Sequence, residues 1–252
     1  MTTALPIGPA RATTAVHRLP TEVKIVAATT FVFAVVATPR EAMWAFALHF
    51  AVVAVICVLA GIRCAWLAPR MSIEAPFVVL AVLLPFAEAG ERVGVLGVSL
   101  SVPGLYAAWG ILVKGTLGVL VSLVLAATTP AQDLPAGLAR LRVPPLITTV
   151  AVLMLRYLEL LAAEANRMHR ARISRGDDPR TLHRIGATAR GIGGLFVRAY
   201  ERGERVHLAM ISRGFTGAVP IFGPPAAAVA WAVGLLPAVA AGAVCAAAWV
   251  TA

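Results

Sequence analysis

Long apolar stretches with almost no charge alternate with short charged ones in the first half of the chain, and one such stretch returns at the end. This pattern predicts five membrane-spanning helices, over residues 23–38, 43–62, 75–88, 104–128 and 224–250. A helix needs roughly 20 residues to cross about 30 Å of hydrocarbon. The first and third predicted spans are shorter than this, so we expect them to borrow flanking residues.

Two segments outside the spans lack a clear periodicity. Residues 93–103 are semi-apolar and alternate poorly, which fits either a short re-entrant segment or a surface hairpin. Residues 1–22 contain three prolines and no apolar core, so they predict a loose tail rather than a cleavable signal peptide.

The region between the fourth and last spans has a different pattern, with three helical stretches separated by proline and glycine. They cover residues 131–141, 146–174 and 180–212. Glycine closes the second and third stretches, at Gly176 and Gly214. Three glycines weaken the middle of the third stretch and predict a bend or break there: Gly191, Gly193 and Gly194. The second stretch is apolar at first and basic at its end, so we expect it at the membrane boundary.

Composition agrees with a membrane protein. Hydrophobic residues make up 60% of the chain and charged residues 13%, whereas a soluble domain is nearer a quarter charged. Residues 139–214 hold 14 of the 22 Lys and Arg, all arginine, against six acids, which leaves +8 of the net +10 in this window. The predicted fold is all-α, with a tail (1–22), a four-span region (23–130), a helical insert (131–216) and a last membrane helix (217–252).

The basic residues also predict the orientation. The tail, the link between the second and third spans and the insert all fall on one side of the membrane and are basic. The opposite side holds only Arg40 and Arg92, each beside an acid. By the positive-inside rule, we expect a cell-membrane protein with its N-terminus in the cytoplasm and its C-terminus outside.

A ten-residue segment occurs twice, at 167–176 and, 38 positions later, at 205–214. Seven of ten positions are identical, and both copies end in Ile-Ser-Arg-Gly. Arginine followed by glycine is typical of a helix C-terminus. A helix cap does not explain why His and Ala recur as well. We therefore interpret the two ends as binding elements that enter two equivalent binding sites, here called sockets, on a partner. The planar guanidinium suits this task because it can make two hydrogen bonds to one carboxylate.

Small residues within the repeats predict how the two long helices pack. Ala171 lies three residues before Ser174, and Ala209 lies three residues before Ser212. Small residues at this spacing let helix backbones approach closely. We therefore expect the helices to cross or pack near their repeated ends.

These motifs resemble a known family, the transmembrane T component of energy-coupling factor (ECF) importers, in its CbiQ-like branch. Two Ala/Ser-Arg-Gly motifs at the ends of long cytoplasmic helices mark the family, and Ser174-Arg175-Gly176 and Ser212-Arg213-Gly214 are similar to them. The resemblance covers most of residues 77–216. Its other parts are Thr128-Thr129-Pro130, Arg156-Tyr157, the run 138–144, and Glu201, Glu204, Arg205 and Ala209.

The resemblance implies a non-catalytic scaffold. In the family, the two arginine motifs enter grooves on a pair of ABC-type ATPases, while the membrane part holds a substrate-binding S component. Arg175 and Arg213 would then be the coupling arginines, each followed by a glycine that ends its helix. The implied cargo is a micronutrient, such as cobalt, nickel or a vitamin, and no cofactor is implied.

The sequence gives less support to other chemistry. A phosphate-binding loop of the GxxxxGK[ST] type is absent from the sequence, so ATP hydrolysis would belong to a partner. His169 and His207 recur in the repeats, but they have no ligand spacing with Cys or acids, and no metal site is predicted. Lys114, deep in a span, is either an S-component contact, paired within the bundle, or snorkelling to the interface. The alternative function is a membrane-embedded enzyme of lipid metabolism with a basic interfacial domain. Anionic lipid is an expected contact of the insert, and nucleic acid is not.

Overall fold

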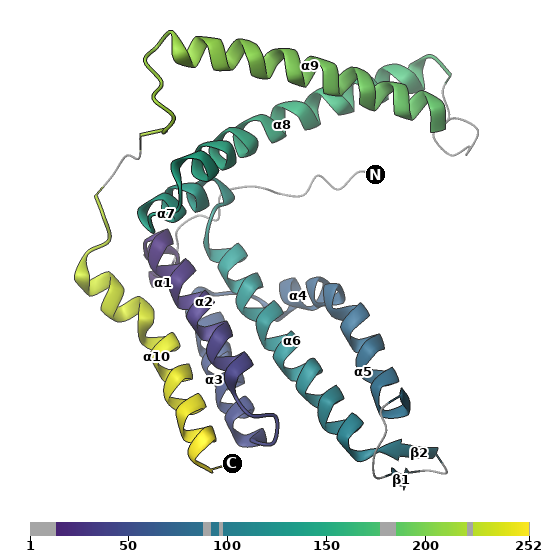
Figure 1. The fold of residues 1–252 in the computed structure, drawn as a ribbon, viewed down its shortest axis with the longest axis vertical. Coiled ribbons are helices and arrows are strands. Elements are labelled where there is room, and N and C mark those ends of the chain that lie inside the picture. Colours follow the sequence, from purple (N-terminus) through teal and green to yellow (C-terminus); the bar gives the residue numbers. More distant parts are fainter. Residues whose placement is uncertain (1–13, 88–91, 96–97, 177–184, 221–223, 252) are drawn as a thin grey trace. The chain divides into compact units, whose positions relative to one another are not determined.

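The computed structural model describes residues 14–87, 92–95, 98–176, 185–220 and 224–251 (Figure 1). Its α-helices are α1 (Ala15–Arg18), α2 (Thr21–Ala37), α3 (Met43–Ala60), α4 (Cys64–Leu67), α5 (Ala75–Ala87), α6 (Val102–Thr128), α7 (Leu134–Arg140), α8 (Pro145–Ser174), α9 (Ile185–Ile211) and α10 (Ala228–Thr251). Two 3₁₀ helices, η1 (Ala68–Glu74) and η2 (Ala131–Asp133), and two strands, β1 (Arg92–Val95) and β2 (Val98–Ser101), complete the described elements. The chain forms two compact units: a bundle unit, Met1–Gly137 with Pro224–Ala252, and an insert unit, Leu138–Gly223.

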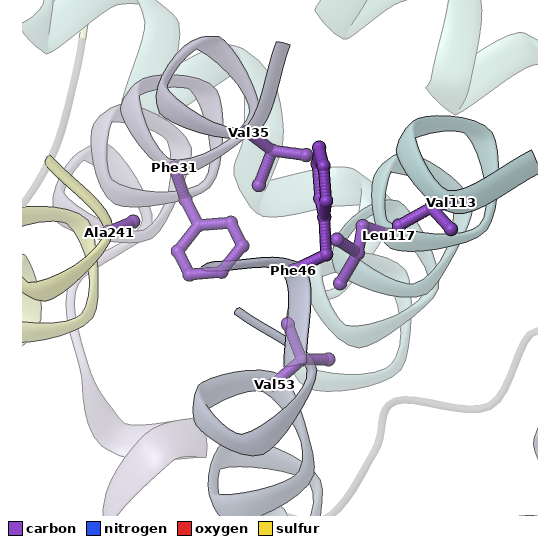
Figure 2. Packing of buried hydrophobic residues seen from close by; sticks show 7 residues of the cluster. All are labelled: Phe31, Val35, Phe46, Val53, Val113, Leu117 and Ala241. Atoms are coloured by element: carbon purple, nitrogen blue, oxygen red, sulfur yellow. The ribbon is translucent and has the colours of Figure 1, made fainter. Parts of the chain in front are cut away.

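The core of the bundle unit lies where α2, α3, α6 and α10 meet (Figure 2). Seven apolar side chains from these four helices, each at most 6% exposed, form it: Phe31, Val35, Phe46, Val53, Val113, Leu117 and Ala241. His49 of α3 is buried beside them, donates from Nδ1 to the carbonyl oxygen of Ala45 at 2.7 Å, and stacks edge-on against Phe31. The core therefore joins helices that are far apart in sequence, including the last one.

Small residues allow the closest helix contacts of the bundle unit. A Cβ built on Gly234 of α10 would lie 2.3 Å from Cγ1 of Val23 in α2. A Cβ on Gly104 of α6 would lie 2.9 Å from the Cα of Pro85 in α5. The alanines of α10 also allow neighbouring helices to approach closely, since Ala238, Ala241 and Ala248 are all buried. Backbones packed this closely gain dispersion contacts, which hold membrane helices together where burial from water contributes little.

Within the described residues, five helical segments are long and apolar enough to cross a membrane: Met43–Ala60, Cys64–Ala87, Val102–Thr128, Pro145–Ser174 and Ala228–Thr251. Four of them overlap predicted spans, and the third predicted span (75–88) gains α4 and η1 as flanking residues. The fifth is α8, which we had assigned to the insert. The first predicted span corresponds to α2, which has 17 residues and is shorter than the others. The prediction of an all-α membrane protein is confirmed, and only a two-stranded hairpin departs from it in the described part of the chain.

Tryptophans mark the two ends of α10. Trp231 and Trp249 are 18 residues apart, which is about 27 Å of helix. This length is close to the thickness of the hydrocarbon core, and tryptophan favours the interface on either side of it. Nε1 of Trp249 donates to the carbonyl oxygen of Ala37 at the end of α2, 3.0 Å away, so α2 and α10 end at a similar depth.

The segment before α6 forms an antiparallel hairpin, with Arg92 opposite Ser101 and Val95 opposite Val98. This answers the question left open by the sequence, where a hairpin and a re-entrant segment both fitted. The tail also differs from expectation in its described part. Residues 15–18 form α1 instead of a loose tail, and residues 1–13 lie outside the described part of the chain.

In the insert unit, α8 and α9 run antiparallel (Figure 1). Arg172 near the end of α8 bonds to Thr188 near the start of α9, and Glu164 bonds to Arg198 further along. A bend or break was predicted at the three glycines, and there is no break, because α9 is continuous from Ile185 to Ile211. A glycine costs only about 1 kcal/mol in a helix interior, a cost that contacts with a neighbouring helix can offset.

Candidate functional site

The two repeats end in the same local structure. α8 ends at Ser174 and α9 at Ile211, and the closing glycines take the left-handed conformation, with φ of +81° at Gly176 and +82° at Gly214. Glycine reaches this region without the steric cost that a Cβ brings. The sequence-based assignment of both glycines as helix terminators therefore agrees with the backbone.

The hydrogen bonds within the two endings also match. Oγ of Ser174 donates to the carbonyl oxygen of Ala171 at 3.0 Å, and Oγ of Ser212 donates to that of Ala209 at 3.1 Å. The amides of the arginines and glycines each donate to a carbonyl three residues back, at 2.9–3.1 Å in both copies. The recurrence of Ala, Ile, Ser, Arg and Gly thus corresponds to one tight helix ending built twice.

The arginines at these endings are available to a partner. Ser174, Arg175, Gly176, Ser212, Arg213 and Gly214 are all exposed. Among the described residues, neither Arg175 nor Arg213 makes a side-chain hydrogen bond or ion pair. A Cβ built on either glycine would meet nothing within 4 Å. Each ending, here called a tip, therefore exposes a positively charged arginine side chain.

Ala171 and Ala209 are both exposed, and packing of the helices at these two alanines stays a prediction. One described contact between α8 and α9 does involve a repeat, since Arg172 donates to Oγ1 of Thr188 at 3.1 Å, and a second ties Glu164 to Arg198. Both repeats end at helix C-termini, and antiparallel helices place their C-termini at opposite ends of the pair. From the tie between Glu164 and Arg198, Arg175 is 11 residues away in one direction and Arg213 is 15 residues away in the other. The two tips are thus roughly 35–40 Å apart.

A carboxylate that the sequence analysis did not single out joins the two helices. Oε1 of Glu164 accepts a hydrogen bond from Nη1 of Arg198 at 2.9 Å, and its Oε2 accepts from Nε of Arg167 at 3.2 Å. These bonds, first from Arg167 and then from Arg198, hold the pKa of the Glu164 carboxyl below its ordinary value. Leu160, Leu161 and Leu195 line the groove around the pair. The signal for Glu164 was available, because it is an acid in an otherwise basic half-helix.

Lys114 has a bonding partner inside the bundle. Its Nζ donates to the carbonyl oxygen of Val36 in the last turn of α2, at 2.7 Å. The lysine thus reaches the negative end of a neighbouring helix, not an acid. This gives Lys114 a structural contact between α6 and α2, and its contact with an S component stays a prediction.

The two histidines that recur in the repeats do not come together in the described part of the insert. His169 and His207 are exposed on different helices, and the described residues contain no group of three His, Cys, Asp or Glu side chains that could hold a metal ion. What the insert offers is two equivalent cationic tips on a helical frame.

These features define the class: a multi-pass, all-helical membrane protein that carries a large helical insert before its last helix. A family model described as "Cobalt transport protein" (CbiQ) matches residues 12–221. The chain therefore belongs to the CbiQ family of cobalt transport proteins.

Individual relatives agree with the family. The chain is 31% identical over 148 residues to the "Cobalt transport protein CbiQ" of Rhodobacter capsulatus, a match that covers 58% of this chain and 59% of that protein. It is 26% identical over 147 residues to the "Putative fused cobalt transport protein CbiMQ" of Methanocorpusculum labreanum, covering 56% of this chain and 24% of the relative. An uncharacterised protein of Methanocaldococcus jannaschii is 32% identical over 117 residues, covering 44% of this chain and 42% of that protein. The matches thus span less than two thirds of each relative.

Proposed function

We propose that the chain is the energy-coupling transmembrane scaffold of an ECF-type ABC importer. In this role it links two ATPase subunits to a membrane-embedded, substrate-binding S component. Hydrolysis of ATP takes place on the partner subunits, and the cargo is a micronutrient, with cobalt favoured over nickel and vitamins by the family's description.

The observation that carries this proposal is the pair of identical tips. Two copies of one helix ending, each presenting an exposed arginine, lie at opposite ends of the α8–α9 pair. A partner that binds both tips needs two equal sockets, and a dimer of ATPase subunits has them. Arg175 and Arg213 are the coupling arginines, and Gly176 and Gly214 fix the turn that exposes them.

A further surface of the insert fits the membrane partner. Ile192, Phe196 and Tyr200 follow one another at four-residue spacing on α9 and are all more than 60% exposed. Large apolar side chains at this spacing form a continuous stripe on a helix. We assign this stripe to contact with the S component and the lipid around it. The fused relative, whose name joins two cobalt transport proteins in one chain, supports a second protein of this kind beside the present one.

Orientation is part of the proposal. The basic insert lies in the cytoplasm, where the ATPases are, and the positive-inside rule then puts the N-terminus inside and the C-terminus outside.

The proposal is tested by purifying the tagged chain from membranes in mild detergent and identifying the proteins that accompany it. Wild-type protein should bring down one or two ABC ATPases and a small membrane protein. Each charge-assisted arginine contact is worth about 1.5–3 kcal/mol, so Arg175→Ala or Arg213→Ala should weaken ATPase binding roughly 10- to 150-fold, and the double variant by far more.

Arg170→Ala is the matched control. Arg170 is an exposed arginine of the first repeat, but its counterpart in the second copy is Leu208. It should leave ATPase binding unchanged. A double variant Arg175→Ala/Arg213→Ala that retains the ATPases and transports normally would refute the coupling role. A wild-type preparation that is well folded and free of ATPase would favour the lipid-metabolic alternative.

A further inference from the structure

One turn of helix at the start of α2 contacts described residues on both sides of the insert: Thr128 and Gly137 before it, and Ala226 after it. We propose that residues 21–24, here called the insert clamp, hold the two ends of the insert together and transmit its movement to the membrane helices. The transmission part of this inference rests on the proposed function. The clamp itself is a feature of the bundle unit alone.

The strongest contact of the clamp is made by Lys24. The residue is 8% exposed, and its Nζ donates to the carbonyl oxygen of Thr128, the last residue of α6, at 2.8 Å. The same Nζ donates to the carbonyl oxygen of His17 in α1 at 3.0 Å. The last four carbonyls of a helix have no partner within it and carry its negative dipole end. Lys24 therefore holds α6 at the point where the chain leaves the membrane for the insert.

Glu22 makes the complementary contact on the return path. It is 3% exposed, and its Oε1 accepts a hydrogen bond from the amide of Ala226, 3.1 Å away and two residues before α10 begins. An acid at a helix N-terminus satisfies an amide and meets the positive dipole end. Residues 128 and 226 are thus tied to side chains only two positions apart.

Apolar contacts complete the clamp. A Cβ on Gly137, the last residue of the bundle unit before the insert, would lie 2.8 Å from Cγ2 of Thr21. Val23 is fully buried against Gly234 of α10. Each of the four successive residues therefore contacts a different position in the segments that precede or follow the insert: Gly137, Ala226, Gly234 and Thr128.

The stability of the fold does not require charged side chains at positions 22 and 24. Burying a lysine and a glutamate carries a desolvation penalty, and apolar side chains of similar volume often replace buried charges without loss of stability. The polar clamp holds helix ends through their backbones and fixes their direction. A displacement of the insert at either end then pulls on the same turn, at the start of α2, which contributes Phe31 and Val35 to the core.

The first measurement needs only the purified chain in lipid nanodiscs. Amide hydrogen exchange is followed at residues 129–137 and 224–230 in wild type, Lys24→Met and Glu22→Gln. Losing a buried, charge-assisted hydrogen bond should speed exchange of both segments about 10- to 100-fold. Trp249→Phe is the matched control, because it removes a side-chain-to-backbone bond between α10 and α2 at the other end of these helices. It should leave both segments unchanged.

The second measurement uses the complete complex in proteoliposomes and compares substrate transported with ATP hydrolysed. A loss of folding or assembly lowers both in proportion. The clamp predicts that Lys24→Met and Glu22→Gln keep ATP hydrolysis near wild type while transport per ATP falls at least about fivefold, and that Lys24→Arg restores much of it. Trp249→Phe keeps the wild-type ratio.

The outcomes separate the clamp from the proposed function. Unchanged exchange in both variants would show that residues 21–24 do not hold the insert, and would overturn the inference. Faster exchange with an unchanged transport ratio would overturn the transmission role. If wild-type protein binds no ATPase, the proposed function fails and transmission fails with it, whereas the exchange result still decides whether the clamp exists.

Discussion

The closing glycines of α8 and α9 give a sharp test of whether the shape of the tips matters. Gly214→Ala adds one carbon at a backbone with φ of +82°, and this carbon would meet no atom within 4 Å. The cost is therefore backbone strain alone, about 1–2 kcal/mol for an L-residue in the left-handed region. Asparagine tolerates this region better than alanine, so Gly214→Asn should cost less.

The helix end can relieve this strain by adopting another conformation, and the arginine side chain would then point in a different direction. The population of the native tip then falls about 5- to 30-fold relative to other conformations, and the affinity for a partner that needs this tip falls by up to the same factor. The assay is binding of the purified ATPase subunits to the chain in nanodiscs. Alanine should weaken binding more than asparagine, and Gly176→Ala should act like Gly214→Ala.

Gly193→Ala is the matched control for this series. Gly193 lies inside α9, is exposed, and its added Cβ also meets nothing within 4 Å. Alanine favours a helix interior by about 0.5–1 kcal/mol, so this variant should bind normally and be slightly more stable. The reasoning is refuted if Gly193→Ala weakens binding as much as Gly214→Ala, or if alanine and asparagine at Gly214 bind equally well.

Three other expectations follow from single contacts. Gly104→Ala places a carbon 2.9 Å from the Cα of Pro85 in α5 and should lower the free energy of unfolding by about 1–3 kcal/mol, seen as a lower melting temperature in detergent. Gly118→Ala, whose added carbon meets nothing within 4 Å, should leave the melting temperature unchanged. The pKa of the Glu164 carboxyl is lowered, so its ion pair with Arg198 of α9 is fully present above the ordinary carboxyl pKa and is lost as the pH falls through the lowered pKa. A spin-label distance between α8 and α9 should therefore increase at that low pH in wild type. The same distance should be independent of pH in Glu164→Gln. Single-cysteine labels at Thr2 and Ala252 should react with impermeant reagents from opposite sides of the membrane, and reaction from the same side would contradict the assigned orientation.

Much of the fold was predictable because membrane helices are strongly constrained. Each needs a long uncharged stretch, and proline or glycine marks where it ends. The predicted spans 43–62 and 104–128 fall within two residues of α3 and α6. The left-handed glycines were equally predictable, since Ser-Arg-Gly after a basic helical stretch is a helix ending on local grounds alone.

Long-range contacts were not predictable from one sequence. Lys24 lies at the start of the short first predicted span, and pairing within the bundle was one of three alternatives for Lys114. The structure pairs both lysines with backbone carbonyls of other helices, 104 and 78 residues away in sequence. A carbonyl carries no residue-specific signal, so no spacing rule points to it. Glu22 and Lys24 did share one hint, an acid and a base in the first turn of an otherwise apolar helix.

The antiparallel arrangement of α8 and α9 determines how the two repeated ends are related. The short connection between α8 and α9 favours antiparallel neighbours, and two C-termini of antiparallel helices cannot meet. The same fact strengthens the case for a two-site partner. Antiparallel helices with identical endings are related by an approximate two-fold axis across the pair, and a symmetric dimer presents two equal sites about such an axis. Sockets spaced roughly 35–40 Å apart would accept both tips at once, and the second tip would bind at high effective concentration. Shortening α9 by one turn, about 5.4 Å, should therefore cost more affinity than removing either arginine's hydrogen bonds alone, because it disturbs both contacts.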